Sequence, residues 1–190
     1  MVLFHEYKEI PLNITDLLFD KSNADAISEF AKKFNVDNSQ AKDAISSLAK
    51  SLSQGLGYHT KKESGQGSLF DALNKGKHSR YLDDPSLIGR EDTTKDGNDI
   101  LGHIFGNKDV SRHVAKRAAK KTGLSSSLLK KMLPVVATMV MGALSKGMFG
   151  GSAKPQRQES TGFLTKIFDK DGDGSMVDDM LGMAFKAAFR

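Results

Sequence analysis

Apolar residues recur at spacings of three and four between residues 13 and 56, and this spacing predicts amphipathic helices. Asp37 and Gln40 have the spacing of a capping box, which predicts the start of a second helix there. No stretch alternates apolar and polar residues with period two, so we expect little or no β-sheet. The positions that form the pattern are Ile27, Phe30, Ala31, Phe34, Ala41, Ala44, Ile45, Leu48 and Leu52.

A further amphipathic helix is predicted from Val110 to Thr122, and its polar side is basic. At 100° per residue the basic side chains fill about half of the helical circumference, and the apolar side chains occupy the opposite arc. These basic residues are Arg112, His113, Lys116, Arg117, Lys120 and Lys121.

The longest apolar run, Met132 to Leu144, is 13 residues. A membrane span needs about 20 residues, so we expect no transmembrane helix. A helix that is apolar on every side must be covered by the rest of its own fold, by a second subunit or by lipid. Because methionines are common at adaptable interfaces, we expect a homo-oligomer. Its contacts are predicted at Met132, Val135, Val136, Met139 and Val140.

Three stretches rich in Gly, Ser, Lys or Asp lack sustained periodicity, and we expect loops or linkers at 57–67, 76–98 and 147–162. These predict an N-terminal helical repeat over 1–75, a linker over 76–98 and a C-terminal helical repeat with an Asp-Gly-rich tail over 99–190.

The two halves match when one is shifted by 88 residues, from AKKFNVDNSQAKDAISSLAKSLSQGL at Ala31 to AKKTGLSSSLLKKMLPVVATMVMGAL at Ala119. A second echo links DILGHIF, 99–105, with DMLGMAF, 179–185. Neither copy alone buries enough apolar surface. We therefore expect an all-α fold, in which two diverged copies of a helical module pack as one globular unit with an Asp/Gly-rich C-terminal turn.

Residues 99–147 together with 163–182 resemble the bacterial YidB-like family, catalogued as domain of unknown function 937. The shared motifs are Leu-Gly-x-Ile-Phe-Gly before a helix, Thr-Gly-Leu-Ser between helices, an apolar helix led by Leu-Pro, and a terminal Asp-Gly-Asp-Gly turn. The resemblance implies a helical, homeodomain-like module and no established activity.

The net charge of +5 is unevenly distributed. Between Val110 and Gln158 there are ten Lys or Arg and no Asp or Glu, whereas the remainder has 18 basic and 23 acidic residues. Such asymmetry suggests an anionic partner. A basic surface that faces an acidic part of the same chain would give the same distribution of charge along the sequence. The chain contains no cysteine and its first residues lack a signal-peptide pattern, so we expect a cytoplasmic protein.

Catalytic motifs are missing from the sequence, and we expect no enzyme. The five histidines are scattered, with no pair at metal-ligand spacing. The glycine-rich GMFGGSAK, from Gly147, lacks the order of a phosphate-binding loop.

Nucleic-acid binding is the alternative function. Ala119, Gly123 and Leu129 have the spacing of a helix-turn-helix, in which a small residue, a glycine turn and an apolar residue lock two helices together. The basic helix could contact phosphates or an anionic membrane, or it could be only a solvated face. Few polar side chains after Lys131 remain to contact base edges.

The stretch DKDGDGSMVDD, 169–179, resembles the first part of an EF-hand loop and predicts a weak calcium site. Three aspartates occupy positions one, three and five, and glycine supplies the turn at six. Met180 stands where the loop has its bidentate glutamate, which weakens the site. The alternative needs no metal. The Asp-Gly stretch would form only a turn, and the aspartates after it would stand in the first turn of a helix, where the helix dipole favours negative charge. The candidate ligands are Asp169, Asp171, Asp173, Ser175, Asp178 and Asp179.

Calorimetric titration tests this calcium site. Calcium should give saturable heat with a dissociation constant of about 10⁻⁴–10⁻³ M, because the bidentate ligand is missing. The heat should disappear in the variant Asp171→Asn with Asp173→Asn. If the wild-type protein gives no saturable heat at millimolar calcium, only the turn remains.

Overall fold

The computed structural model describes residues 13–60, 63–149, 163–164 and 167 of this chain. This part of the chain is all-helical and contains no strand, as the apolar spacing predicted. Its elements are α1 (Ile14–Leu18), η1 (Lys21–Asn23), α2 (Ala24–Phe34), α3 (Asn38–Thr60), α4 (Glu63–Lys75), α5 (Arg80–Asp83), η2 (Pro85–Leu87), α6 (Glu91–Phe105), α7 (Lys108–Thr122) and α8 (Ser126–Phe149).

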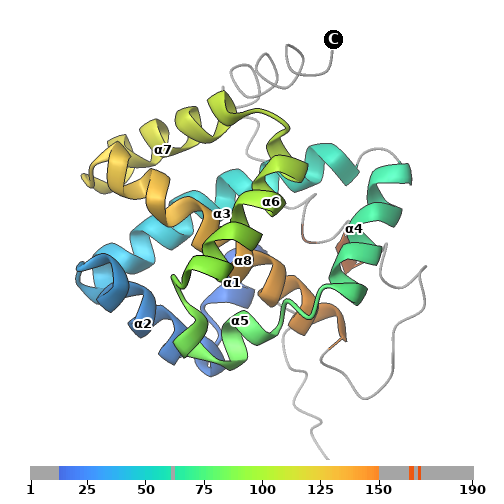
Figure 1. The fold of residues 1–190 in the computed structure, drawn as a ribbon, viewed down its shortest axis with the longest axis horizontal. Helices are drawn as coiled ribbons and strands as arrows, with labels where there is room; N and C mark the ends of the chain where they lie inside the picture. Colours follow the sequence, from blue (N-terminus) through green and yellow to red (C-terminus); the bar gives the residue numbers. More distant parts are fainter. Residues whose placement is uncertain (1–12, 61–62, 150–162, 165–166, 168–190) are drawn as a thin grey trace, which may run out of the picture.

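Helix α8 lies at the centre, and α1, α3, α4, α5, α6 and α7 pack around it (Figure 1). Every residue from Met132 to Ser145 is buried. The apolar run is therefore covered by the chain's own fold, which was one of the alternatives for it. By length and composition α8 would also be able to cross a membrane, but 83% of its most apolar window is buried, as in core helices of water-soluble proteins.

Helix α6 crosses α8 at a point where only glycine fits. A Cβ atom built on Gly97 would lie 2.0 Å from the carbonyl oxygen of Pro134, so the two backbones are in direct contact. Helix α8 continues through Pro134, which has no N–H to donate to the carbonyl four residues earlier. The α6–α8 packing therefore depends on the missing side chain at residue 97.

The prediction of loops at the glycine-rich stretches is wrong in three places. Residues 57–60 and 63–67 lie in α3 and α4, residues 147–149 end α8, and the stretch 76–98 contains α5, η2 and the first part of α6, 91–98. The physical reason is that glycines in these helices allow neighbouring elements to approach. Besides Gly97, a Cβ atom on Gly147 would lie 2.8 Å from the ring of Phe163.

Two tight turns join α2 to α3 and α7 to α8, and they have corresponding caps. Asn35 and Gly123 end the first helix of each pair in the left-handed conformation, with φ of 52° and 72°. The side chain of Asp37 accepts a hydrogen bond from the Gln40 backbone at 2.8 Å, and Gln40 Oε1 accepts one from the Asp37 N–H at 3.2 Å. This confirms the predicted capping box.

Burial follows the same 88-residue correspondence. Each buried residue of α3 falls on a buried residue of α8 when it is shifted by 88 positions. The surroundings of the two helix pairs differ, because α7 packs on α3, α6 and α8, whereas α2 contacts α3, η1, η2 and α5.

The close contact at Gly97 predicts a large difference between two glycines of the same helix. Gly97→Ala should lower the free energy of unfolding by about 1–3 kcal/mol, because the new methyl group overlaps the Pro134 carbonyl. Gly102→Ala is the matched control, since a Cβ atom there meets nothing within 4 Å. The free energy of unfolding of that variant should rise by about 0.5–1 kcal/mol, because alanine has a higher helix propensity than glycine. Urea denaturation measures both, and equal effects would contradict the α6–α8 contact.

Candidate functional site

Helix α7 uses its apolar side for packing. Asn107 caps its start by accepting a hydrogen bond from the Asp109 N–H at 2.8 Å, and the Gly123 N–H donates to the Ala119 carbonyl at its end. Four small apolar side chains face α3, α6 and α8, which leaves the opposite side of the helix to solvent. The buried residues are Val110, Val114, Ala115 and Ala118.

The six predicted basic residues lie on the outer side of α7. Arg117 is half-buried and the other five are exposed. We name this set the basic face: Arg112, His113, Lys116, Arg117, Lys120 and Lys121.

Two members of the basic face are held by Asp109 near the start of the helix. The Arg112 guanidinium forms a short ion pair with the Asp109 carboxylate. A ring nitrogen of His113, Nδ1, lies 2.8 Å from the Asp109 carbonyl oxygen. These contacts fix the two side chains without neutralising the rest of the helix.

The other four members have no carboxylate within 4.0 Å among the residues that the structure describes. Lys116 and Lys120 are one helical turn apart on the exposed side, and Lys121 is exposed beside them. Cations at this spacing produce a positive potential along the helix.

The structure adds two cations that the sequence reasoning missed. Lys130 and Lys131 are exposed near the start of α8, and neither has an ion-pair partner in the described ranges. They follow three exposed serines, 125–127, and precede the buried run. In the sequence, their position directly before the apolar run could have identified them. In the structure, they lie on the first two turns of α8.

The turn between α7 and α8 has the local features of the predicted helix-turn-helix. Gly123 adopts a φ of 72°, and Leu129 is fully buried. The Ser125 hydroxyl accepts a hydrogen bond from the Leu128 N–H at 3.2 Å and caps α8. In the first part of α8 only the first two turns are open to solvent, since every residue from Met132 to Ser145 is buried. This geometry offers few side chains for contacts with base edges.

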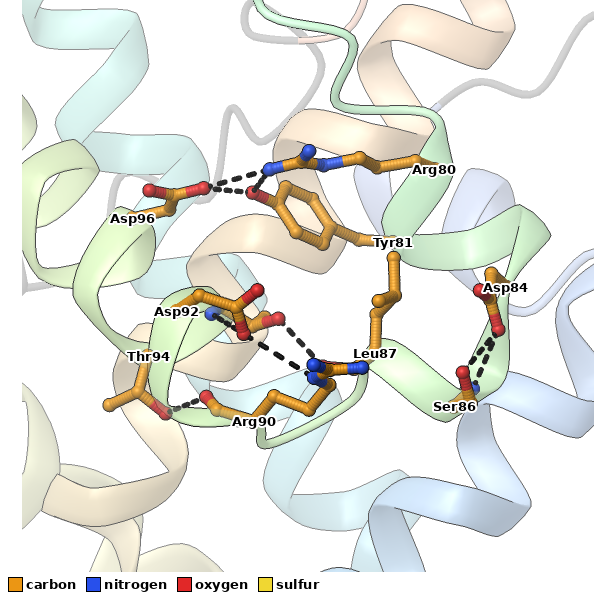
Figure 2. Close-up of polar contacts among 10 residues, drawn as sticks. Arg80, Tyr81, Asp84, Ser86, Leu87, Arg90, Asp92, Thr94 and Asp96 are labelled. Carbon is orange, nitrogen blue, oxygen red and sulfur yellow. Dashed lines mark hydrogen bonds and ion pairs between the residues drawn. The ribbon is translucent and has the colours of Figure 1, made fainter.

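A second polar cluster joins α5 to α6 (Figure 2). Arg80 Nη2 donates to the Tyr81 hydroxyl at 2.8 Å and to Asp96 Oδ2 at 3.1 Å, and Tyr81 makes a short hydrogen bond to the same carboxylate. Tyr81 is 2% exposed, and burial raises the pKa of its hydroxyl. Burial likewise lowers the pKa of His78, whose ring lies beside Tyr81.

The same region holds the start of α6 in place. Figure 2 shows the Asp84 carboxylate accepting hydrogen bonds from the Ser86 N–H and hydroxyl, at 3.1 Å and 2.6 Å. The Thr93 hydroxyl donates to the Leu87 carbonyl at 2.6 Å, and Thr93 is buried. These contacts connect η2 to the first turn of α6, so the cluster has a structural explanation.

No group of three or more His, Asp or Glu side chains in the described residues is close enough to hold a metal ion. Of the histidines there, His59 has its Nε2 atom 2.7 Å from the Ile104 carbonyl oxygen, and His103 is exposed on α6. The predicted calcium ligands, from Asp169 to Asp179, lie outside the described residues.

The residues predicted for self-association lie in the interior. All five are at most 1% exposed: Met132, Val135, Val136, Met139 and Val140. In this structure none of them is available to a second subunit, because α8 is already covered by six other helices.

Comparison with known proteins places the chain in one family. No curated protein and no solved structure gives a significant match. The family model described as "Bacterial protein of unknown function (DUF937)" matches residues 16–147. The match runs from within α1 almost to the end of α8, so it includes the basic face and the central helix. The match covers well over half of the sequence, and the chain therefore belongs to this family of bacterial proteins of unknown function.

Proposed function

We propose that this protein is a non-enzymatic, nucleic-acid-binding protein that contacts the phosphates of a duplex through the basic face of α7. The observation that supports this proposal best is the row of cations on the outer side of α7, four of which have no carboxylate partner in the described part of the chain. Lys and Arg that neutralise phosphates release condensed counterions, and this release is the main driving force of non-specific binding.

The burial pattern favours a polyanion over a membrane. A helix that lies in a membrane interface inserts an apolar side into the lipid. Helix α7 has its apolar side packed on α3, α6 and α8, and among the described large hydrophobic residues only Tyr58, on α3, is exposed. Lipid binding by this face would be electrostatic alone.

The exposed surface supports binding without sequence specificity. Base readout usually requires several side chains of a recognition helix to enter the major groove. Here the second helix of the pair is open to solvent over its first two turns, from Ser126 to Lys131, whereas α7 has one side open along its whole length. The expected contacts are therefore phosphates along α7, with Lys130 and Lys131 extending the same positive region.

We also propose that α2–α3 and α7–α8 are diverged copies of one module. The 88-residue match in sequence, the equivalent caps and the equivalent burial support this relationship. The charges of the two copies differ: Asp25 and Glu29 of α2 stand at the positions that correspond to His113 and Arg117 of α7. The proposed binding function belongs to the second copy alone.

Self-association is not part of this proposal, since the side chains on which it was expected are buried. The calcium site stays a prediction from the sequence. Neither is required for the proposed contact between α7 and phosphates.

Binding to a DNA duplex of random sequence, followed by fluorescence anisotropy, tests the proposed function. In the variant Lys120→Gln with Lys121→Gln, affinity at roughly 50 mM salt should fall about tenfold and the log–log salt slope should decrease by about 2. The matched control is Lys32→Gln with Lys33→Gln, which removes the two lysines at the corresponding positions of α2. That control should bind like the wild type.

Three outcomes would overturn the proposal. One is an absence of binding at low salt. A second is an equal loss of affinity in the control variant, which would indicate a dependence on net charge alone. A third is tighter binding to vesicles of anionic phospholipid than to the duplex, which would assign the face to a membrane surface.

A further inference from the structure

The chain contains an acidic segment whose charge complements the basic face. Residues 169–179 include five aspartates and one lysine, a net charge of −4. We name these residues the acidic segment. It begins two positions after Ile167, a residue that the structure describes.

The chain just before the acidic segment is held on the core. Leu164 and Ile167 are 2% and 1% exposed. The ring of Phe163 lies against Gly147 near the end of α8, where Leu17 of α1 also approaches. The acidic segment is thus tethered to the same unit that presents the basic face.

We propose that the acidic segment docks on the basic face and competes there with nucleic acid. This inference rests on the proposed function for its consequence, because competition requires that nucleic acid binds to the same face. The contact itself requires only opposite charges. Lys116, Lys120 and Lys121 are exposed and have no carboxylate partner among the described residues.

The length of the chain permits this contact. From Ile167 to Asp179 there are 12 residue steps, and an extended chain of that length spans at most about 40 Å. A domain of this size has a radius of gyration of only about 14 Å. A tethered ligand acts at an effective concentration of about a millimolar, so even a weak contact competes with a ligand in solution.

The tether makes the acidic segment a stronger competitor than a free peptide, and its effect should depend on salt. At about 0.1 M salt the Debye length is roughly 10 Å, and at 1 M it is roughly 3 Å. The docked segment should therefore dissociate at high salt, where duplex binding also weakens. The competition is expected to be measurable only at low and moderate salt.

The first experiment measures duplex affinity in the full chain. The variant Asp169→Asn with Asp171→Asn and Asp173→Asn should bind the random DNA duplex at least fivefold more tightly than the control Asp43→Asn with Asp71→Asn and Asp99→Asn. The control removes the same number of charges from exposed positions on α3, α4 and α6. Equal gains in duplex affinity in the two variants would show that the effect comes from net charge alone, and would overturn the inference.

A second variant keeps the test valid if the first one fails to fold, as judged by circular dichroism. Asp178→Asn with Asp179→Asn leaves the Asp-Gly-Asp-Gly sequence at 171–174 unchanged and should gain at least twofold in duplex affinity. An affinity equal to that of the wild type would overturn the inference.

The second experiment does not depend on nucleic acid. Zero-length carbodiimide cross-linking of the full chain at low salt, read by mass spectrometry, should join lysines 116, 120 or 121 to aspartates of 169–179 within one molecule. The cross-links should disappear at about 1 M salt, where charges are screened. Their presence without duplex binding would support the docked segment and refute the proposed function, whereas their absence would overturn this inference and leave the proposed function standing.

Discussion

The fold depends on the burial of α8 from Met132 to Ser145. A helical segment with an apolar surface on every side is stable only when other helices cover it, and six helices do so here. One of these contacts has no room for adjustment, because α6 reaches α8 through Gly97, whose backbone lies against the Pro134 carbonyl. The short elements α5 and η2 set the start of α6 and so determine where this crossing occurs.

The burial of α8 also determines what α7 can present to a partner. Helix α7 packs its small apolar residues on α3, α6 and α8, so its exposed side consists of charged groups. A helix whose cations have no carboxylate partner among the described residues is suited to a polyanion. Because α8 protrudes from the core only in its first two turns, α7 is the better candidate for the helix that contacts phosphates.

The polar cluster around Tyr81 serves the fold. Arg80, Tyr81 and Asp96 join α5 to α6 through hydrogen bonds, and the Nδ1 atom of His78 is buried with no hydrogen-bond partner among the described residues. Burial lowers the pKa of His78 and favours its neutral ring, against the opposing effect of a backbone hydrogen bond to Ala72. Together these residues stabilise a short connection whose sequence, taken alone, resembles a flexible linker.

Local features of this protein were determined by its sequence. The capping box at Asp37, the left-handed turn at Gly123 and the basic side of α7 depend on residues within a few positions of one another, so periodicity and turn chemistry predict them. Tertiary structure decided which helices cover α8 and how the glycines are used. Gly97 resembles a helix breaker in the sequence, but in the fold it lies inside α6, because the absence of its side chain lets two helices make contact. Contacts between residues far apart in the chain leave no periodic signal, and for that reason only the folded structure reveals them.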